Sequence, residues 1–177
     1  CHVLNERSDS PLAARLTLTA YAADGGVVID GARDVALPGG GSLSVESAEL
    51  FGIFFDVTCA YRFGTPAHVV TVARLSDAQS GAFLAEAFHF PLGRGHARRA
   101  DLGLAAEVVS DGQWRHALRL TTRAPAQSVH IACEGFEPAD DWFHLAPGEG
   151  RLVALKGRGR PAGHVAALNG AGPVAFG

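Results

Sequence analysis

The sequence has no methionine, only three cysteines, few aromatic residues and no long apolar run. A membrane-spanning helix needs about 20 consecutive apolar residues, and no run here approaches that length; the first residues also lack a signal-peptide pattern. Neither sign of charge is in large excess, because the 15 Lys and Arg nearly balance the 18 Asp and Glu and leave a net charge of −3. We therefore expect neither a nucleic-acid nor a membrane partner. The compartment stays open between cytoplasm and periplasm.

The missing methionine and the strand-like start His2-Val3-Leu4 suggest a piece of a longer protein. Three cysteines cannot all pair within one chain. We expect Cys59, in the middle of a predicted strand, and Cys133, after another, to be free buried thiols, with a Cys59–Cys133 disulfide as the alternative. Cys1 indicates a fragment boundary rather than a lipid anchor, because no processing signal accompanies it.

The common cofactor motifs are absent as well. There is no phosphate loop, no dinucleotide-binding fingerprint and no Gly-x-Ser-x-Gly nucleophile elbow, so no cofactor is expected. The eight histidines lack zinc-type spacing, and no metal is expected. A minor alternative is that His130 and His144 approach each other across strands near Asp141.

What the sequence does contain is an apolar period of two. Leu16, Leu18 and Ala20 alternate with polar residues, and Gly25-Gly26 is typical of a hairpin turn. Strands are predicted at residues 14–22, 27–29, 35–37, 43–45, 54–62, 68–75, 83–90, 104–109, 114–122, 127–133, 151–156 and 163–168. The only helical signal is one short turn at residues 47–51, with Ser47 as its cap. Residues 91–100 lack periodicity and are predicted to be a linker. The sequence thus predicts an all-β protein of two consecutive Ig-like β-sandwich domains, residues 1–95 and 100–177.

Two carboxylate pairs invite a catalytic interpretation, because a retaining glycosidase uses two carboxylates about 5 Å apart. Asn5-Glu6 has the form of an acid/base pair but follows a strand, so we interpret it as a solvated strand end. Asp140-Asp141 cannot converge on one atom from a strand, since adjacent residues point to opposite faces. We interpret this second pair as turn-forming.

Residues 135–149, GFEPADDWFHLAPGE, are the densest in specific side chains. In a ligand-binding interpretation, Trp142 is an aromatic platform with Asp140 or Asp141 as acceptors. In a structural one, which we favour, Phe136, Phe143 and Leu145 enter a sandwich core, Trp142 and His144 share the opposite strand face, and Pro147-Gly148 makes a turn. Trp142 and Asp141 are kept as candidate ligand or domain contacts.

The stretch GFEPADDWFHLAPGEGRLVAL, with Gln127–Ile131 before it, resembles the last Ig-like domain of β-mannosidases of glycoside hydrolase family 2. HVLNE, PLAARLTLTAYA, GIFFDVTCAYRFG and FLAEAFHFPLG resemble, in that order, the preceding Ig-like domain. The resemblance implies a parent that hydrolyses terminal β-D-mannosides with retention. It also implies that the two catalytic glutamates lie in a (β/α)8 barrel, which needs about 250 residues and cannot fit here.

The resemblance therefore predicts a non-catalytic C-terminal fragment that is inactive alone. Its expected partner is the missing catalytic barrel, and a mannoside is a candidate ligand. The alternative is a stand-alone carbohydrate-binding or adhesion module of two Ig-like domains, with Trp114 or Trp142 as the contact residue.

Overall fold

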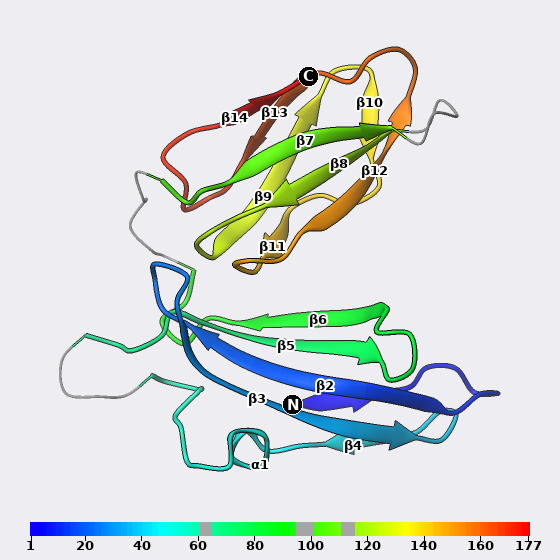
Figure 1. Cartoon of the computed structure of the whole chain (residues 1–177), viewed down its shortest axis with the longest axis vertical. Helices are drawn as coiled ribbons and strands as arrows, with labels where there is room; N and C mark the ends of the chain where they lie inside the picture. Colours follow the sequence, from blue (N-terminus) through cyan, green and yellow to red (C-terminus); the bar gives the residue numbers. More distant parts are fainter. Residues whose placement is uncertain (61–64, 95–100, 111–115) are drawn as a thin grey trace. The chain divides into compact units, whose positions relative to one another are not determined.

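A computed structural model of the chain describes residues 1–60, 65–94, 101–110 and 116–177. Within these ranges regular structure consists of fourteen strands and one short helix, so the all-β prediction is confirmed (Figure 1). No helix in the described ranges is long and apolar enough to cross a membrane. The chain divides into two compact units. Unit 1 comprises Cys1–Ala22 and Val27–Leu92, and unit 2 comprises Ala23–Gly26 and Gly93–Gly177.

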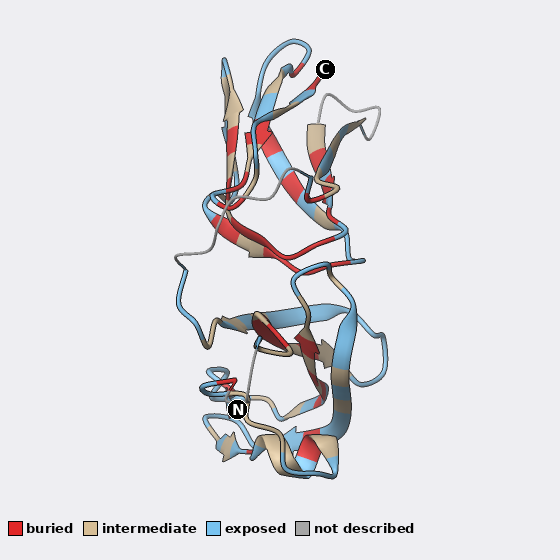
Figure 2. Ribbon diagram, turned by 90° about the vertical axis from the view of Figure 1, so that its left-hand side faces the viewer, coloured by how far each residue is buried: buried red, intermediate tan, exposed pale blue. Residues whose placement is uncertain are grey.

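Unit 1 packs a four-stranded antiparallel sheet, in the order β3-β2-β5-β6, with a two-stranded sheet, β1-β4. The strands are β1 (His2–Leu4), β2 (Leu12–Tyr21), β3 (Val27–Leu37), β4 (Ser42–Ser44), β5 (Val70–Asp77) and β6 (Phe83–His89). The buried core comprises Val3, Ala14, Leu16, Leu18, Val35, Leu37, Val45, Leu50 and Leu75. Its members on β2 are the alternate residues that the period-two pattern predicts, and Figure 2 shows how buried and exposed positions are distributed along the strands.

Helix α1 (Ser47–Phe51) forms where the sequence predicts it, but its cap differs from the prediction. The N-cap residue is Glu46 and not Ser47, and the Glu46 backbone N–H donates to Glu49 Oε1 at 3.2 Å. Strand β3 approaches this helix closely at Gly31, where an added Cβ would lie 2.0 Å from the Leu50 carbonyl oxygen. A side chain at position 31 would therefore push the helix away from the sheet.

The strand predicted at residues 54–62 is wrong for its described part, residues 54–60, which are turn and coil. Asp56 explains the difference, because its Oδ1 accepts the backbone N–H groups of Thr58 and Cys59 at 3.1 and 3.0 Å. This local turn competes with strand pairing for the same donors. Cys59 is consequently exposed and not buried in a strand, and Phe54 is 87% exposed.

Unit 2 packs two four-stranded antiparallel sheets, in the orders β10-β12-β8-β7 and β11-β9-β13-β14. The strands are β7 (Ala105–Ser110), β8 (His116–Thr121), β9 (Ala126–Cys133), β10 (Phe136–Pro138), β11 (Phe143–Leu145), β12 (Arg151–Gly157), β13 (Gly163–Ala166) and β14 (Val174–Phe176). The core between the sheets includes Leu118, Leu120, Val129, Ile131, Val153 and Val165.

The two shortest strands that the sequence pattern missed are β10 and β14. Three residues are too few to show an alternation, so no period signals them. The predicted linker at residues 91–100 falls largely outside the described residues.

Candidate functional site

Residues 135–149 form strand β10, a bend at residues 139–142, strand β11 and a turn at Pro147-Gly148. Phe143 and Leu145 are buried in the core of unit 2, and Phe136 packs against it partly buried. The structural interpretation of these three residues is confirmed. The turn expected at Pro147-Gly148 is also present.

Trp142 lies in the bend and not in the strand, which corrects the prediction that it shares a strand face with His144. Its φ is 59°, in the left-handed region that a bulky residue seldom adopts. The indole stacks on the His130 ring, with centroids 4.4 Å apart and planes 12° from parallel. Trp142 is nevertheless 62% exposed. One aromatic face is thus covered by a histidine from β9 while much of the side chain meets solvent.

Asp141 holds this arrangement in place. Its Oδ1 accepts the backbone N–H of Ile131 at 2.9 Å and that of Trp142 at 3.0 Å. Its Oδ2 lies 2.8 Å from His130 Nδ1. One carboxylate therefore fixes the backbone at the strained residue and the ring beneath the indole, which is how a left-handed tryptophan is stabilised.

The neighbouring Asp140 serves a different partner. It forms an ion pair with Arg151 on β12, and its Oδ1 accepts the Asp141 backbone N–H at 2.8 Å. The Arg151 guanidinium also lies over the Phe143 ring, 4.2 Å from its centroid. The two adjacent carboxylates are thus part of a bend and bond to different partners, so the turn-forming interpretation of the pair is confirmed.

His144 does not join His130. Its Nδ1 accepts the backbone N–H of Ser128 at 3.0 Å, at the point where the β9–β11 register shifts and Ser128 has a φ of 46°. An acceptor nitrogen requires a neutral imidazole. Burial, and secondarily the nearby Arg94 charge, lowers the pKa of His144 accordingly. The described ranges hold no group of three metal-ligating side chains.

Asn5 and Glu6 are not an acid/base pair, but the interpretation as a solvated strand end holds only for the exposed Glu6. Asn5 is buried, 4% exposed, and its Nδ2 donates to the carbonyls of Ser10 and Pro38 at 2.8 and 3.1 Å. It clamps the loop after β1 to the turn after β3. An amide committed to two carbonyls has a structural role.

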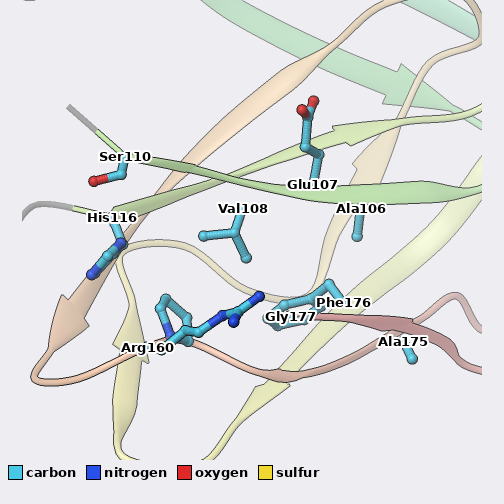
Figure 3. A pocket seen from close by; sticks show the side chains of 10 residues that line it. Ala106, Glu107, Val108, Ser110, His116, Arg160, Ala175, Phe176 and Gly177 are labelled. Atoms are coloured by element: carbon cyan, nitrogen blue, oxygen red, sulfur yellow. The ribbon is translucent and has the colours of Figure 1, made fainter. Parts of the chain in front are cut away.

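A pocket of about 690 Å³ lies in unit 2 and is lined by residues of β7, β8 and β14 and by Arg160 (Figure 3). Figure 3 shows the Arg160 side chain lying beside Phe176, while the Glu107 carboxylate points away from it. The Oε2 atom of Glu107 instead lies 3.7 Å from Nη1 of Arg119. Because Glu107 is the one carboxylate side chain among the described lining residues, this pocket lacks the pair that glycoside hydrolysis needs.

The three cysteines are free, and Cys1 and Cys133 are half-buried. The disulfide alternative is therefore not formed. Cys133 Sγ lies 3.4 Å from the Ala162 carbonyl oxygen, and burial raises the pKa of its thiol. A thiol held neutral in this way is a poor nucleophile.

No protein-family model and no curated protein matches the chain. Solved structures do match its fold. An exo-chitosanase of Amycolatopsis orientalis, in complex with PNP-β-D-glucosamine, aligns with 98% of this chain at 14% identity and a TM-score of 0.60. The β-D-mannosidase of Dictyoglomus thermophilum aligns with 96% at 10% identity and a TM-score of 0.65.

This chain spans only 24% of the length of that exo-chitosanase and 22% of that of the β-D-mannosidase. At such identities the likeness shows the fold alone. The resemblance to part of a β-mannosidase, which the sequence motifs predicted, is confirmed as a likeness of fold. The same fold occurs as about a quarter of much longer glycan-degrading proteins.

Proposed function

We propose that the chain is the non-catalytic C-terminal part of a β-mannosidase-like glycoside hydrolase, whose whole form hydrolyses terminal β-D-mannosides with retention. The observation that carries the proposal is the fold match, which extends over nearly all of this chain and about a quarter of two glycan-degrading enzymes. In this plan residues 1–95 and 100–177 are the penultimate and last Ig-like domains. Their partner is a catalytic barrel elsewhere in the parent protein.

The side chains of this part support a non-catalytic role. Retaining hydrolysis needs one carboxylate as acid/base and a second as nucleophile, about 5 Å apart across a cleft. Here Asp140 pairs with Arg151, and Asp141 is bonded to two backbone N–H groups and His130. These acids shape a bend, so the chemistry belongs to the barrel and the two sandwiches support it.

The test is the reading frame that contains this chain, followed by an assay of its product. We expect a (β/α)8 barrel to be encoded before His2. The whole product should hydrolyse an aryl β-mannoside with retention of anomeric configuration, observed by NMR, and the 177-residue chain should show no turnover. A frame without a barrel would overturn the proposal.

The competing function is a stand-alone Ig-like carbohydrate-binding or adhesion module. The observation that favours it is Trp142, an exposed aromatic side chain held in a strained conformation. The reading frame separates the two functions, since a stand-alone module requires no barrel. A ligand contact at Trp142 is compatible with either.

A further inference from the structure

At the bend around Trp142 specific hydrogen bonds hold a large apolar side chain in solvent. We propose that the stacked pair of Trp142 and His130 is a platform that holds one pyranose ring of a β-linked hexose glycan. The proposal rests on the proposed function only for the class of glycan. The geometry of the platform is independent of it.

The first argument is the orientation of the indole. An exposed tryptophan normally samples several rotamers, and ordering it costs conformational entropy on binding. Here the His130 ring, 4.4 Å away and nearly parallel, fixes the plane of the indole before any ligand arrives. Because His130 covers one face of the indole, the 62% exposure of Trp142 leaves the rest of the ring for a partner.

The second argument is what surrounds the pair. Ala166 on β13 lies directly opposite His130 in the sheet register, and an alanine is too small to cover the stack. The same bend carries Asp140, which is paired with Arg151, and the stack itself presents the second nitrogen of His130; these groups donate and accept hydrogen bonds. Protein-docking patches are apolar at their centre and depleted of charge. An aromatic plane on a bend that also carries charged and polar groups fits a sugar, which presents C–H bonds on one face and hydroxyl groups at its edge.

The third argument assigns Asp141 a role distinct from binding. Its two oxygens already serve Ile131, Trp142 and His130, so it is a positioning residue and not a ligand contact. The platform contact is Trp142. Asp141→Asn keeps an oxygen for the backbone N–H groups but removes the charge that faces His130, and it should weaken binding a few-fold without unfolding the bend.

The experiment is a fluorescence titration of the full 177-residue chain in a Trp114→Phe background, which leaves Trp142 as the single tryptophan. The probes are β-1,4-linked mannotetraose, cellotetraose and chitosan tetraose. A platform that holds about one ring should bind the preferred glycan with a Kd on the order of 1 mM. Affinity electrophoresis in a gel that contains the matching polysaccharide extends the measurement to variants without Trp142.

Trp142→Ala should weaken binding at least tenfold, and His130→Ala several-fold. Leu152→Ala is the matched control, because Leu152 is equally exposed but lies on β12 in the other sheet of unit 2, and it should bind like the parent chain. Circular dichroism melting identifies any variant that fails to fold, and Trp142→Phe, which keeps an aromatic plane, should retain part of the affinity.

Three results would overturn the inference. The first is no saturable fluorescence signal with any probe at concentrations up to 50-fold above about 1 mM, and the second is a Trp142→Ala variant that binds the glycan as well as the parent chain does. The third is a Trp142→Ala variant that binds the glycan normally but associates more weakly with the parent's catalytic part. The last result would make the bend a protein contact. Failure of the proposed function is a separate outcome, because it is decided by the reading frame and by hydrolysis, whereas glycan binding by this chain is measured without any hydrolase.

Discussion

Each unit buries one asparagine that ties loops together, and the two clamps differ in what they connect. In unit 1 the Asn5 amide bonds the Ser10 and Pro38 carbonyls, and its oxygen accepts the N–H of the exposed Arg7 at 3.3 Å. In unit 2 Asn169, 7% exposed, accepts the N–H of Gln127 at 2.9 Å and donates to the Pro125 carbonyl at 2.8 Å.

The Asn169 clamp joins segments more than 40 residues apart, and all three of its groups are buried. The Asn5 clamp is partly local and partly solvated. Unit 2 is thus closed by long-range contacts between two four-stranded sheets, whereas unit 1 packs its four-stranded sheet with a two-stranded sheet and one short helix.

The largest expected effect comes from the cores. Leu118→Ala in unit 2 removes a side chain with 0% exposure from between two four-stranded sheets, and we expect a loss of about 4 kcal/mol of unfolding free energy. Leu50→Ala in unit 1 should cost about 2 kcal/mol, because the short helix α1 can move into the space. Chemical denaturation of both variants measures the difference; equal losses would contradict the contrast between the units.

The next largest losses of unfolding free energy should come from the Asn169 and Asn5 clamps. Asn169→Ala leaves the buried Gln127 N–H and Pro125 carbonyl without partners, and we expect a loss of about 2–3 kcal/mol. Asn5→Ala should cost about 1–2 kcal/mol, since water reaches the Arg7 end of its bonds. The midpoints of urea denaturation give both values. A more damaging Asn5→Ala would show that unit 1 depends on its clamp as strongly as unit 2 does.

The bend provides a smaller and sharper comparison between adjacent residues. Asp141→Ala should destabilise unit 2 by about 1 kcal/mol, because it removes the acceptor of two backbone N–H groups. Asp140→Ala should cost about 0.5 kcal/mol or less, since its ion pair with Arg151 is partly solvated. Hydrogen exchange at the Ile131 and Trp142 amides should accelerate in the first variant and not in the second.

The smallest expected effect near neutral pH is a pH dependence of the free energy of unfolding. Burial lowers the pKa of His68, which is 1% exposed, and that of His144, with Arg94 contributing to the latter. The unfolded chain then binds a proton near pH 6.5 that the folded chain binds only at lower pH. Stability should therefore be full above about pH 6.5 and fall as the pH drops below it. Melting of His68→Phe and His144→Gln across pH 5–8 should show a flatter profile than the parent chain; an unchanged slope in both would contradict the assignment.

The fold was largely predictable from the sequence because its long strands carry a clear period. Strands β2, β5, β9 and β12 are seven or more residues long, β2 alternates clearly between more and less buried residues, and each of the four lies close to its predicted position. Residues 54–60 show where an apolar period fails to predict a strand. Their alternation favours a strand, but one side chain, Asp56, captures two backbone donors and makes a turn. An apolar period does not show whether one side chain will take the backbone N–H groups that a strand would need for pairing.

The sequence predicted which residues form the candidate site but not how their side chains are arranged. The sequence singled out Trp142, Asp141 and the neighbourhood of His130. It did not predict that Trp142 stacks on His130 or that Arg151 pairs with Asp140. The stack depends on which residue of β9 faces the segment before β11, and the β9–β11 register shifts opposite Ser128. The Arg151 contact depends on how β12, in the other sheet, lies beside the bend. A bulge carries no reliable sequence signal when its residue is a serine rather than a glycine. Whether Trp142 and Asp141 contact a ligand stays a prediction.

We propose that this chain is part of a glycosidase whose catalytic residues lie elsewhere in the parent protein. The most direct measurement compares the 177-residue chain with the product of its whole reading frame on aryl β-mannoside and aryl β-glucosaminide, the two sugar classes of the structural neighbours. We predict turnover of the mannoside by the whole product, little of the glucosaminide, and none of either by the chain alone. Two results would contradict the account: turnover of either substrate by the chain alone, or no turnover of any β-glycoside by either protein.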